Sequence, residues 1–146
     1  MIIDLTIEIK ENEVVLLKGA IIKKPELGKP KKTYSQYART FDESSSQWID
    51  CAEYNLMNLR MLEREANEIL KRDGYLFLND VYHMLGMSRT KDGAVVGWVY
   101  DKENPTGDNF VDFEIYHERN KDFVNGEKKT ALLDFNVDGD ILDHLN

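Results

Sequence analysis

The sequence is poor in the residues and runs that mark several common protein classes. Its single cysteine, Cys51, cannot form an internal disulfide, which fits a reducing cytoplasm. No apolar run approaches the roughly 20 residues that span a bilayer, and the N-terminus lacks the basic flank and apolar core of a secretory signal. Neither a Gly-x-Gly-x-x-Gly fingerprint nor a Walker-type Gly-Lys-Ser/Thr loop occurs. We therefore expect a cytoplasmic protein with no membrane partner and no nucleotide signature.

What is present is an ordinary globular composition with an acidic charge. The chain has 146 residues, 42% hydrophobic and 32% charged, which is enough for one domain and argues against wholesale disorder. The net charge of −8 argues against nucleic-acid binding through overall basicity. The charge is uneven, because residues 1–40 carry a net +3 and residues 98–146 a net −7. Five of the basic residues lie within ten positions of one another: Lys23, Lys24, Lys29, Lys31 and Lys32.

The first 33 residues divide into two expected segments. Residues 3–9 alternate apolar and polar side chains, and a turn at residues 11–12 can return the chain into a second strand, so we predict a β-hairpin over 1–22. A two-stranded hairpin alone is only marginally stable in water. We therefore expect the main domain or a second copy of the hairpin to cover its apolar face, and the second case would make the protein a homodimer. Residues 23–33 predict a solvated basic linker, with docking on an acidic surface or contact with nucleic acid as the alternatives.

The remaining residues, 34–146, are expected to form an α+β domain. Apolar steps of three and four predict a helix over residues 50–72, with Asp50 as its cap and Gly74 as its stop. Met57 and Met61 are interpreted as core, with a partner groove as the alternative. A shorter helix is predicted from a cap at Asn79 to Gly86. Runs at 94–100, 110–116 and 130–137 predict strands, and residues 141–145 an edge strand or a turn.

These elements predict two helices packed on one face of a mostly antiparallel sheet of three to five strands, beside the N-terminal hairpin. One core is expected to join the sheet and the long helix, and it consists of Trp98, Val96, Val111, Phe113, Leu133, Phe135, Leu59, Leu62, Ala66 and Ile69.

The tail of the domain matches the opening of a calcium loop. Asp134, Asn136, Asp138 and Asp140 alternate around Gly139, which supplies oxygen ligands and a sharp turn. The acid expected at the twelfth position is replaced by Leu145, and a strand entering an Asp-Gly hairpin explains the same residues. Bound Ca²⁺ or Mg²⁺ is thus the weaker of two interpretations, and we otherwise expect no cofactor.

A second acidic group could form if the strands at 110–116 and 130–137 pair. Asp108, Asp112, Glu114 and Asp134 would then converge, and a metal-dependent hydrolase could use Asp112, Glu114, Asp134 and Asp138. A solvated acidic sheet face explains these residues equally well. No nucleophile, base and orienting group can be assembled from the sequence, so we expect no enzyme and no catalytic residue.

The segment before the long helix is rich in aromatic residues. Two interpretations are equally open: it is a partner-binding surface, since aromatic residues and Arg dominate interface anchors, or it packs onto the sheet. The residues concerned are Tyr34, Tyr37, Arg39, Phe41 and Trp48.

Several blocks of the sequence resemble the C-terminal domain of a family of unknown function found in tailed phages and prophages of Firmicutes. The resemblance covers about residues 34–143. It rests on Tyr34-Ser-Gln-Tyr-Ala-Arg39, Phe41-Asp-Glu-Ser-Ser45, Glu53-Tyr-Asn-Leu-Met57, Leu76-Phe-Leu-Asn-Asp-Val-Tyr-His-Met-Leu-Gly86, Val96-Gly-Trp-Val-Tyr100, Gly107-Asp-Asn-Phe-Val-Asp-Phe113, Asp122-Phe-Val-Asn-Gly126 and Leu132-Leu-Asp-Phe-Asn-Val-Asp-Gly139.

The resemblance implies a phage or prophage context and no reaction. Relatives carry membrane-spanning segments ahead of this domain, where this chain has the hairpin-like residues 1–22. We expect a non-enzymatic module that binds a host or phage protein in the bacterial cytoplasm. The alternatives are an acidic inhibitor of a host defence nuclease, which would present carboxylates in place of DNA phosphates, and the metal-dependent hydrolase.

Overall fold

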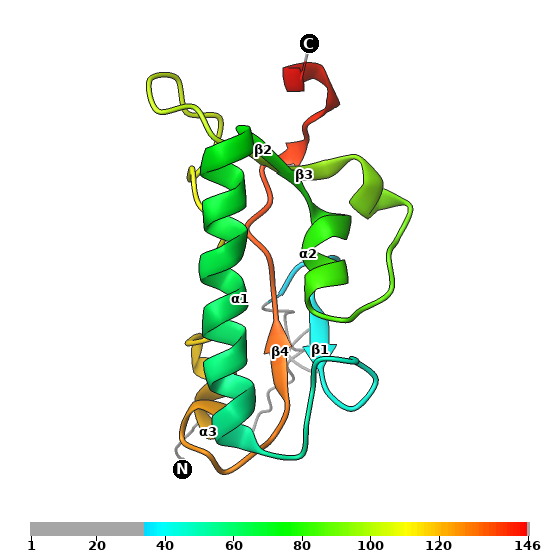
Figure 1. The fold of residues 1–146 in the computed structure, drawn as a ribbon, viewed down its shortest axis with the longest axis vertical. Helices are drawn as coiled ribbons and strands as arrows, with labels where there is room; N and C mark the ends of the chain where they lie inside the picture. Colours follow the sequence, from blue (N-terminus) through cyan, green and yellow to red (C-terminus); the bar gives the residue numbers. More distant parts are fainter. Residues whose placement is uncertain (1–33, 146) are drawn as a thin grey trace, which may run out of the picture. The chain divides into compact units, whose positions relative to one another are not determined.

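The described part of the chain is an α+β fold. A computed structural model describes residues 34–145, which form three α-helices and two small antiparallel sheets (Figure 1). The predicted fold class is confirmed. The hairpin predicted at 1–22, the linker at 23–33 and the dimer predicted through the hairpin lie outside the described residues.

The longest element is α1, Ala52–Asp73. Its buried face repeats at helical spacing, and it ends at Gly74, whose φ of 85° is the left-handed conformation that glycine adopts at low cost; its N–H donates to Leu70 O. The helix begins two residues later than predicted, with Cys51 as N-cap. Asp50 instead accepts a hydrogen bond from Lys129 Nζ at 2.6 Å.

Five short strands form the two sheets. The strands β2 (Tyr75–Phe77), β3 (Val96–Val99) and β5 (Gly139–Asp140) form one sheet with β3 in the centre. The strands β1 (Arg39–Phe41) and β4 (Ala131–Leu133) form the other. The strands expected at 94–100 and 130–137 are therefore present but shorter, and they belong to different sheets rather than to one.

All strand pairs in both sheets are antiparallel. Arg39 lies opposite Leu133 and Phe41 opposite Ala131 in the two-stranded sheet. In the three-stranded sheet, Leu76 lies opposite Trp98 on one side of β3. β1 was expected only as an aromatic segment, so its pairing with β4 is a feature that the sequence pattern did not predict.

The shorter helices depart from the predicted boundaries. The helix α2 spans Leu78–Met84, so Asn79 lies inside it and is not its cap. The helix α3, Lys121–Val124, was not predicted. Single 3₁₀ turns occur at Asp92–Ala94, Glu118–Asn120 and Leu142–Leu145, and the last of these confirms a turn in the tail.

The strand predicted over residues 110–116 is wrong. Val111, Phe113 and Ile115 are buried as the alternation requires, but the segment joins no sheet. Its backbone N–H groups donate to side chains instead, those of Val111 to Asn67 and of Phe113 to Glu63, both on α1. A side-chain acceptor satisfies a buried N–H as well as a neighbouring strand does, so burial alone did not require a sheet.

Within residues 34–145, asparagine side chains make the same contact at five places. In each, the side-chain oxygen accepts from one residue's N–H while the side-chain nitrogen donates to the same residue's carbonyl, which imitates the edge of a strand. The pairs are Asn55 with Ile49, Asn67 with Val111, Asn79 with Thr90, Asn109 with Asp101, and Asn120 with Leu132. Four of these clamps hold irregular segments, and the fifth, at Leu132, holds an edge of β4.

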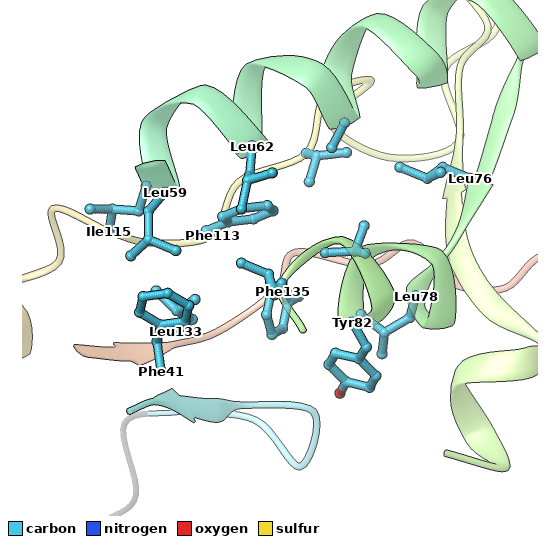
Figure 2. Close-up of a cluster of buried hydrophobic side chains, with 14 of the residues drawn as sticks. Phe41, Leu59, Leu62, Leu76, Leu78, Tyr82, Phe113, Ile115, Leu133 and Phe135 are labelled. Carbon is cyan, nitrogen blue, oxygen red and sulfur yellow. The ribbon is translucent and has the colours of Figure 1, made fainter. Parts of the chain in front are cut away.

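One hydrophobic core joins the helices and both sheets. Phe135 lies at its centre, with edge-to-face contacts to Tyr82 and Phe113 at 5.6 Å between ring centroids (Figure 2). The predicted core is confirmed, because nine of its ten residues are buried and Ile69 packs against them half-buried. The core interpretation of Met57 and Met61 is wrong, since both are exposed.

Candidate functional site

The first two residues of the predicted calcium loop hold backbone in place. Asp134 is buried, and its two carboxylate oxygens accept from Ser35 N–H and Ser35 Oγ, each at 2.6 Å. Asn136 Oδ1 accepts from Trp98 Nε1 at 2.9 Å and from Asp112 N–H at 2.8 Å. These oxygens hold Ser35, Trp98 and Asp112 against the tail of the domain.

The other two residues of that loop serve nearby turns. Asp138 Oδ2 accepts from Val99 N–H at 2.9 Å, and Asp140 Oδ1 accepts from Leu142 N–H at 3.0 Å. Burial raises the pKa of the Asp138 carboxyl, and the hydrogen bond from Val99 opposes that increase. The oxygens of these four residues thus accept hydrogen bonds from different parts of the chain, and the structure does not bring them together as a ligand set.

The second acidic group is divided as well. Asp112 and Glu114 share a cavity with Glu63 of α1, whereas Asp134 faces Ser35 and Asp108 accepts from the Asn136 amide. The cavity has a volume of about 380 Å³ and is lined by Glu63, Asp112, Glu114, Ile115, Tyr116 and His117. Across residues 34–145, no group of three or more His, Cys, Asp or Glu side chains is placed to hold a metal ion.

The charges that line this cavity are already engaged in the fold. Glu114 forms an ion pair with Arg119 at 2.5 Å, and the Asp112 carboxylate accepts from Glu114 N–H at 2.7 Å. Burial raises the pKa of the Glu63 carboxyl, the hydrogen bond from Phe113 N–H opposes it, and the charge of Asp112 adds to the increase. The cavity is acidic, but Glu63 and Asp112 accept hydrogen bonds from the backbone and Glu114 is paired with Arg119.

Most of the predicted aromatic binding segment packs inward. Phe41 is completely buried, and Arg39 lies over the Tyr82 ring with its guanidinium carbon 4.9 Å from the centroid. The Tyr82 hydroxyl donates to Tyr37 O at 2.7 Å, and burial raises the pKa of Tyr82 to about 12. The packing interpretation therefore accounts for these residues.

The two ends of this segment are more accessible. Trp48 is half-buried, and its Nε1–H donates to Lys129 O at 2.7 Å. Tyr34 is 42% exposed at the start of the described chain. Of the five residues predicted to bind a partner, Tyr34 therefore has the largest exposed fraction.

A contiguous apolar surface lies instead on the solvent side of α1. Tyr54, Met57 and Met61 are 45%, 64% and 51% exposed, and their spacing of three and four places them in one stripe. We name this stripe the α1 apolar face. Helical periodicity separates this face from the core, because its residues lie about half a turn away from the buried Leu59, Leu62 and Ala66. Its two methionines are those for which a partner groove was the alternative to the core.

A buried amide borders this face. Asn58 is 6% exposed and lies one helical turn from both Tyr54 and Met61. Its Nδ2 group has no hydrogen-bond partner within the described part of the chain. An unpaired buried donor costs free energy, so this is the least satisfied position on the helix.

Comparisons with known proteins give a family and no activity. No helix within residues 34–145 is long and apolar enough to cross a membrane. No curated protein and no solved structure matches the chain. A family of unknown function, DUF6353, matches residues 7–145, which is nearly the whole chain. The chain therefore belongs to the DUF6353 family of unknown function.

Proposed function

We propose that this protein is a non-enzymatic protein-binding module of a phage or prophage. It acts in the cytoplasm of the bacterial host, where its partner is a host or phage protein. The observation that carries the proposal is the α1 apolar face, formed by Tyr54, Met57 and Met61. The resemblance of residues 34–143 to domains of tailed phages supports the context.

The chemistry of this face suits protein recognition. Isolated exposed apolar residues are normal on protein surfaces, but three in one helical stripe form a continuous patch. Methionine is flexible and polarisable, so it adapts to irregular partner surfaces, and tyrosine combines a large apolar ring with a hydroxyl. Anchors at positions i, i+3 and i+7 are the pattern by which helices dock against grooves or other helices.

The roles of the acidic residues support a binding function over catalysis. Asp134, Asp138 and Glu63 each accept hydrogen bonds from backbone N–H groups, and Glu114 pairs with Arg119. A catalytic carboxylate needs a free oxygen aimed at substrate, with a second group to activate or receive the proton. These carboxylates are used to hold the fold.

Affinity capture tests the proposal. The full chain is immobilised and exposed to lysate of infected and uninfected host cells, beside a Met57→Glu/Met61→Glu double variant and a Phe110→Glu control. Phe110 is 48% exposed but lies outside α1. We expect a stoichiometric protein bound by the wild type and the control and lost with the double variant. Equal capture by all three would refute the α1 apolar face as the binding surface.

A second candidate function is supported by the charge distribution. Residues 34–146 contain 12 Lys or Arg against 22 Asp or Glu, a net of −10, whereas residues 1–33 carry a net of +2. Such a domain could occupy the DNA-binding cleft of a host defence nuclease. Restriction and RNA-guided nucleases should then be inhibited at low salt and recover as salt screens the charges. Full nuclease activity at low salt with excess protein would exclude this candidate.

A further inference from the structure

We propose that the partner of the α1 apolar face is a second copy of this chain, bound with the two α1 helices antiparallel. This inference rests on the proposed function, because it uses the same surface and names its occupant.

The spacing of the apolar residues is compatible with a twofold axis. Met57 and Met61 lie two positions on either side of Leu59. When two helices pack antiparallel about that level, Met57 of each copy lies opposite Met61 of the partner subunit. Tyr54 then lies opposite Arg64 of the partner subunit, where a guanidinium can stack on the ring. Both copies use the same patch, as a twofold interface requires.

The charges beside the face select the antiparallel arrangement. Glu53 and Arg64 are exposed and stand eleven positions apart, which is close to three helical turns, so they share one flank of the stripe. Within residues 34–145 neither forms an ion pair. An antiparallel pair brings each Glu53 near Arg64 of the partner subunit, twice by symmetry. In a parallel twofold pair, Glu53 of one copy and Arg64 of the partner subunit lie about 16 Å apart along the helix axis and on opposite sides of the contact, so this pairing is lost.

The size of the contact sets the expected strength. A standard interface buries about 800 Å² of accessible surface per partner, and three exposed apolar side chains per copy bury far less. The dimer should therefore be reversible, with a dissociation constant of about 10 µM or weaker. It has to be studied over a range of concentrations that extends to several hundred micromolar.

Sedimentation equilibrium of the full chain tests the surface. We expect a reversible monomer–dimer equilibrium, weakened more than about tenfold by Met57→Glu or Met61→Glu, because either substitution buries a charge between the helices. Phe110→Glu serves as the matched control and should leave the equilibrium unchanged. Circular dichroism checks that each variant is folded. A chain that stays monomeric throughout, or a dimer that survives both methionine substitutions, overturns the proposal.

A charge exchange tests the orientation. Glu53→Arg and Arg64→Glu should each weaken association, because each sets like charges face to face. The double variant Glu53→Arg/Arg64→Glu should restore it to within about twofold of the wild type. Failure of the double variant to recover overturns the antiparallel arrangement.

The two proposals fail in different ways. If the chain is monomeric while a captured protein is still lost with the methionine double variant, the second copy is excluded as partner and the binding function stands. If the chain dimerises through the α1 apolar face and captures nothing else, both stand, with self-association as the binding event. If neither dimer nor capture depends on Met57 and Met61, both fail.

Discussion

Two segments with the same alternating pattern, residues 110–116 and 130–137, fold differently. Both bury alternate apolar side chains in one core, and the carbonyl of Phe113 even accepts a hydrogen bond from Asp134 N–H at 3.2 Å. Only the second segment contains a strand, because Ala131–Leu133 has β1 as a backbone partner. The first is held by Asn67 and Glu63. The alternation of apolar and polar residues thus predicts which side chains are buried. It does not predict whether the backbone N–H groups bond to a neighbouring strand or to side chains.

Even the strand depends partly on an asparagine. The edge of β4 that faces away from β1 is clamped by Asn120, whose amide accepts from Leu132 N–H at 2.8 Å and donates to Leu132 O at 2.9 Å. Asn67 makes the same contact to Val111 at 2.7 and 3.0 Å. The two segments thus share one clamped edge and differ at the other, which makes substitution of the clamps a direct test of the comparison.

The largest effect is expected at the clamp on the strand. Asn120 is buried and also donates to Glu114 O, so Asn120→Ala leaves several backbone groups without this partner. We expect a loss of about 3 kcal/mol in the free energy of unfolding, since each unpaired buried group costs about 1–3 kcal/mol. Urea denaturation measures it. Because β1 remains, amide exchange should accelerate most at Leu132 and less at Leu133; uniform acceleration would contradict a local clamp.

A smaller loss is expected at the clamp on the segment without a strand partner. Asn67→Ala removes the acceptor and donor facing Val111, for an expected cost of about 2 kcal/mol. The matched control is Asn109→Gly, which deletes the exposed clamp on Asp101 and suits the φ of 65° at that position. The control should cost less than about 1 kcal/mol, because water replaces the lost bonds. Equal losses in the two variants would show that burial does not set the cost of a lost clamp.

Glu63 of α1, which accepts the hydrogen bond from Phe113 of the same segment, should make the stability of the fold depend on pH. Burial raises the pKa of the Glu63 carboxyl above its ordinary value of 4.5, so the folded protein binds that proton more tightly than the unfolded chain. The Glu63 contribution is therefore present at low pH and is lost as the pH rises through 4.5 toward the raised pKa. Glu63→Gln should remove this slope, a change of less than about 1 kcal/mol at a partly exposed side chain.

Asp42 provides a control, because its effect on the pH dependence of stability has the opposite sign to that of Glu63. The hydrogen bonds from Ser44 lower the pKa of its carboxyl, so its contribution is present above the ordinary value of 3.8 and is lost as the pH falls. Thermal melts from pH 3 to 7, compared between the wild type, Glu63→Gln and Asp42→Asn, separate the two slopes. A difference between the wild type and Glu63→Gln that does not change with pH would contradict the assignment to Glu63.

The comparison also explains how much the sequence could predict. Period two and period 3.6 identified the buried residues well, because the core excludes polar side chains wherever the backbone goes; Trp98, Phe113 and Leu59 are examples. Strand pairing was not predictable, because a side chain such as Asn67 competes with a neighbouring strand for the same N–H, and its distant position carries no local signal. Met57 was misassigned by residue type although its helical position indicated exposure.

The smallest effect is expected from divalent cations, and it extends the comparison to the tail after β4. Asp134, Asn136 and Asp138 give their oxygens to backbone and indole N–H groups, much as the clamping asparagines do. A cation would have to displace those bonds, and binding to the native state raises stability only when it is favourable overall. Addition of millimolar Ca²⁺ or Mg²⁺, or of EDTA, should therefore shift the melting temperature by less than about 1 °C. An increase of several degrees with Ca²⁺, abolished by Asp138→Asn, would show that the tail rearranges into a cation site and that its backbone contacts are the weaker alternative.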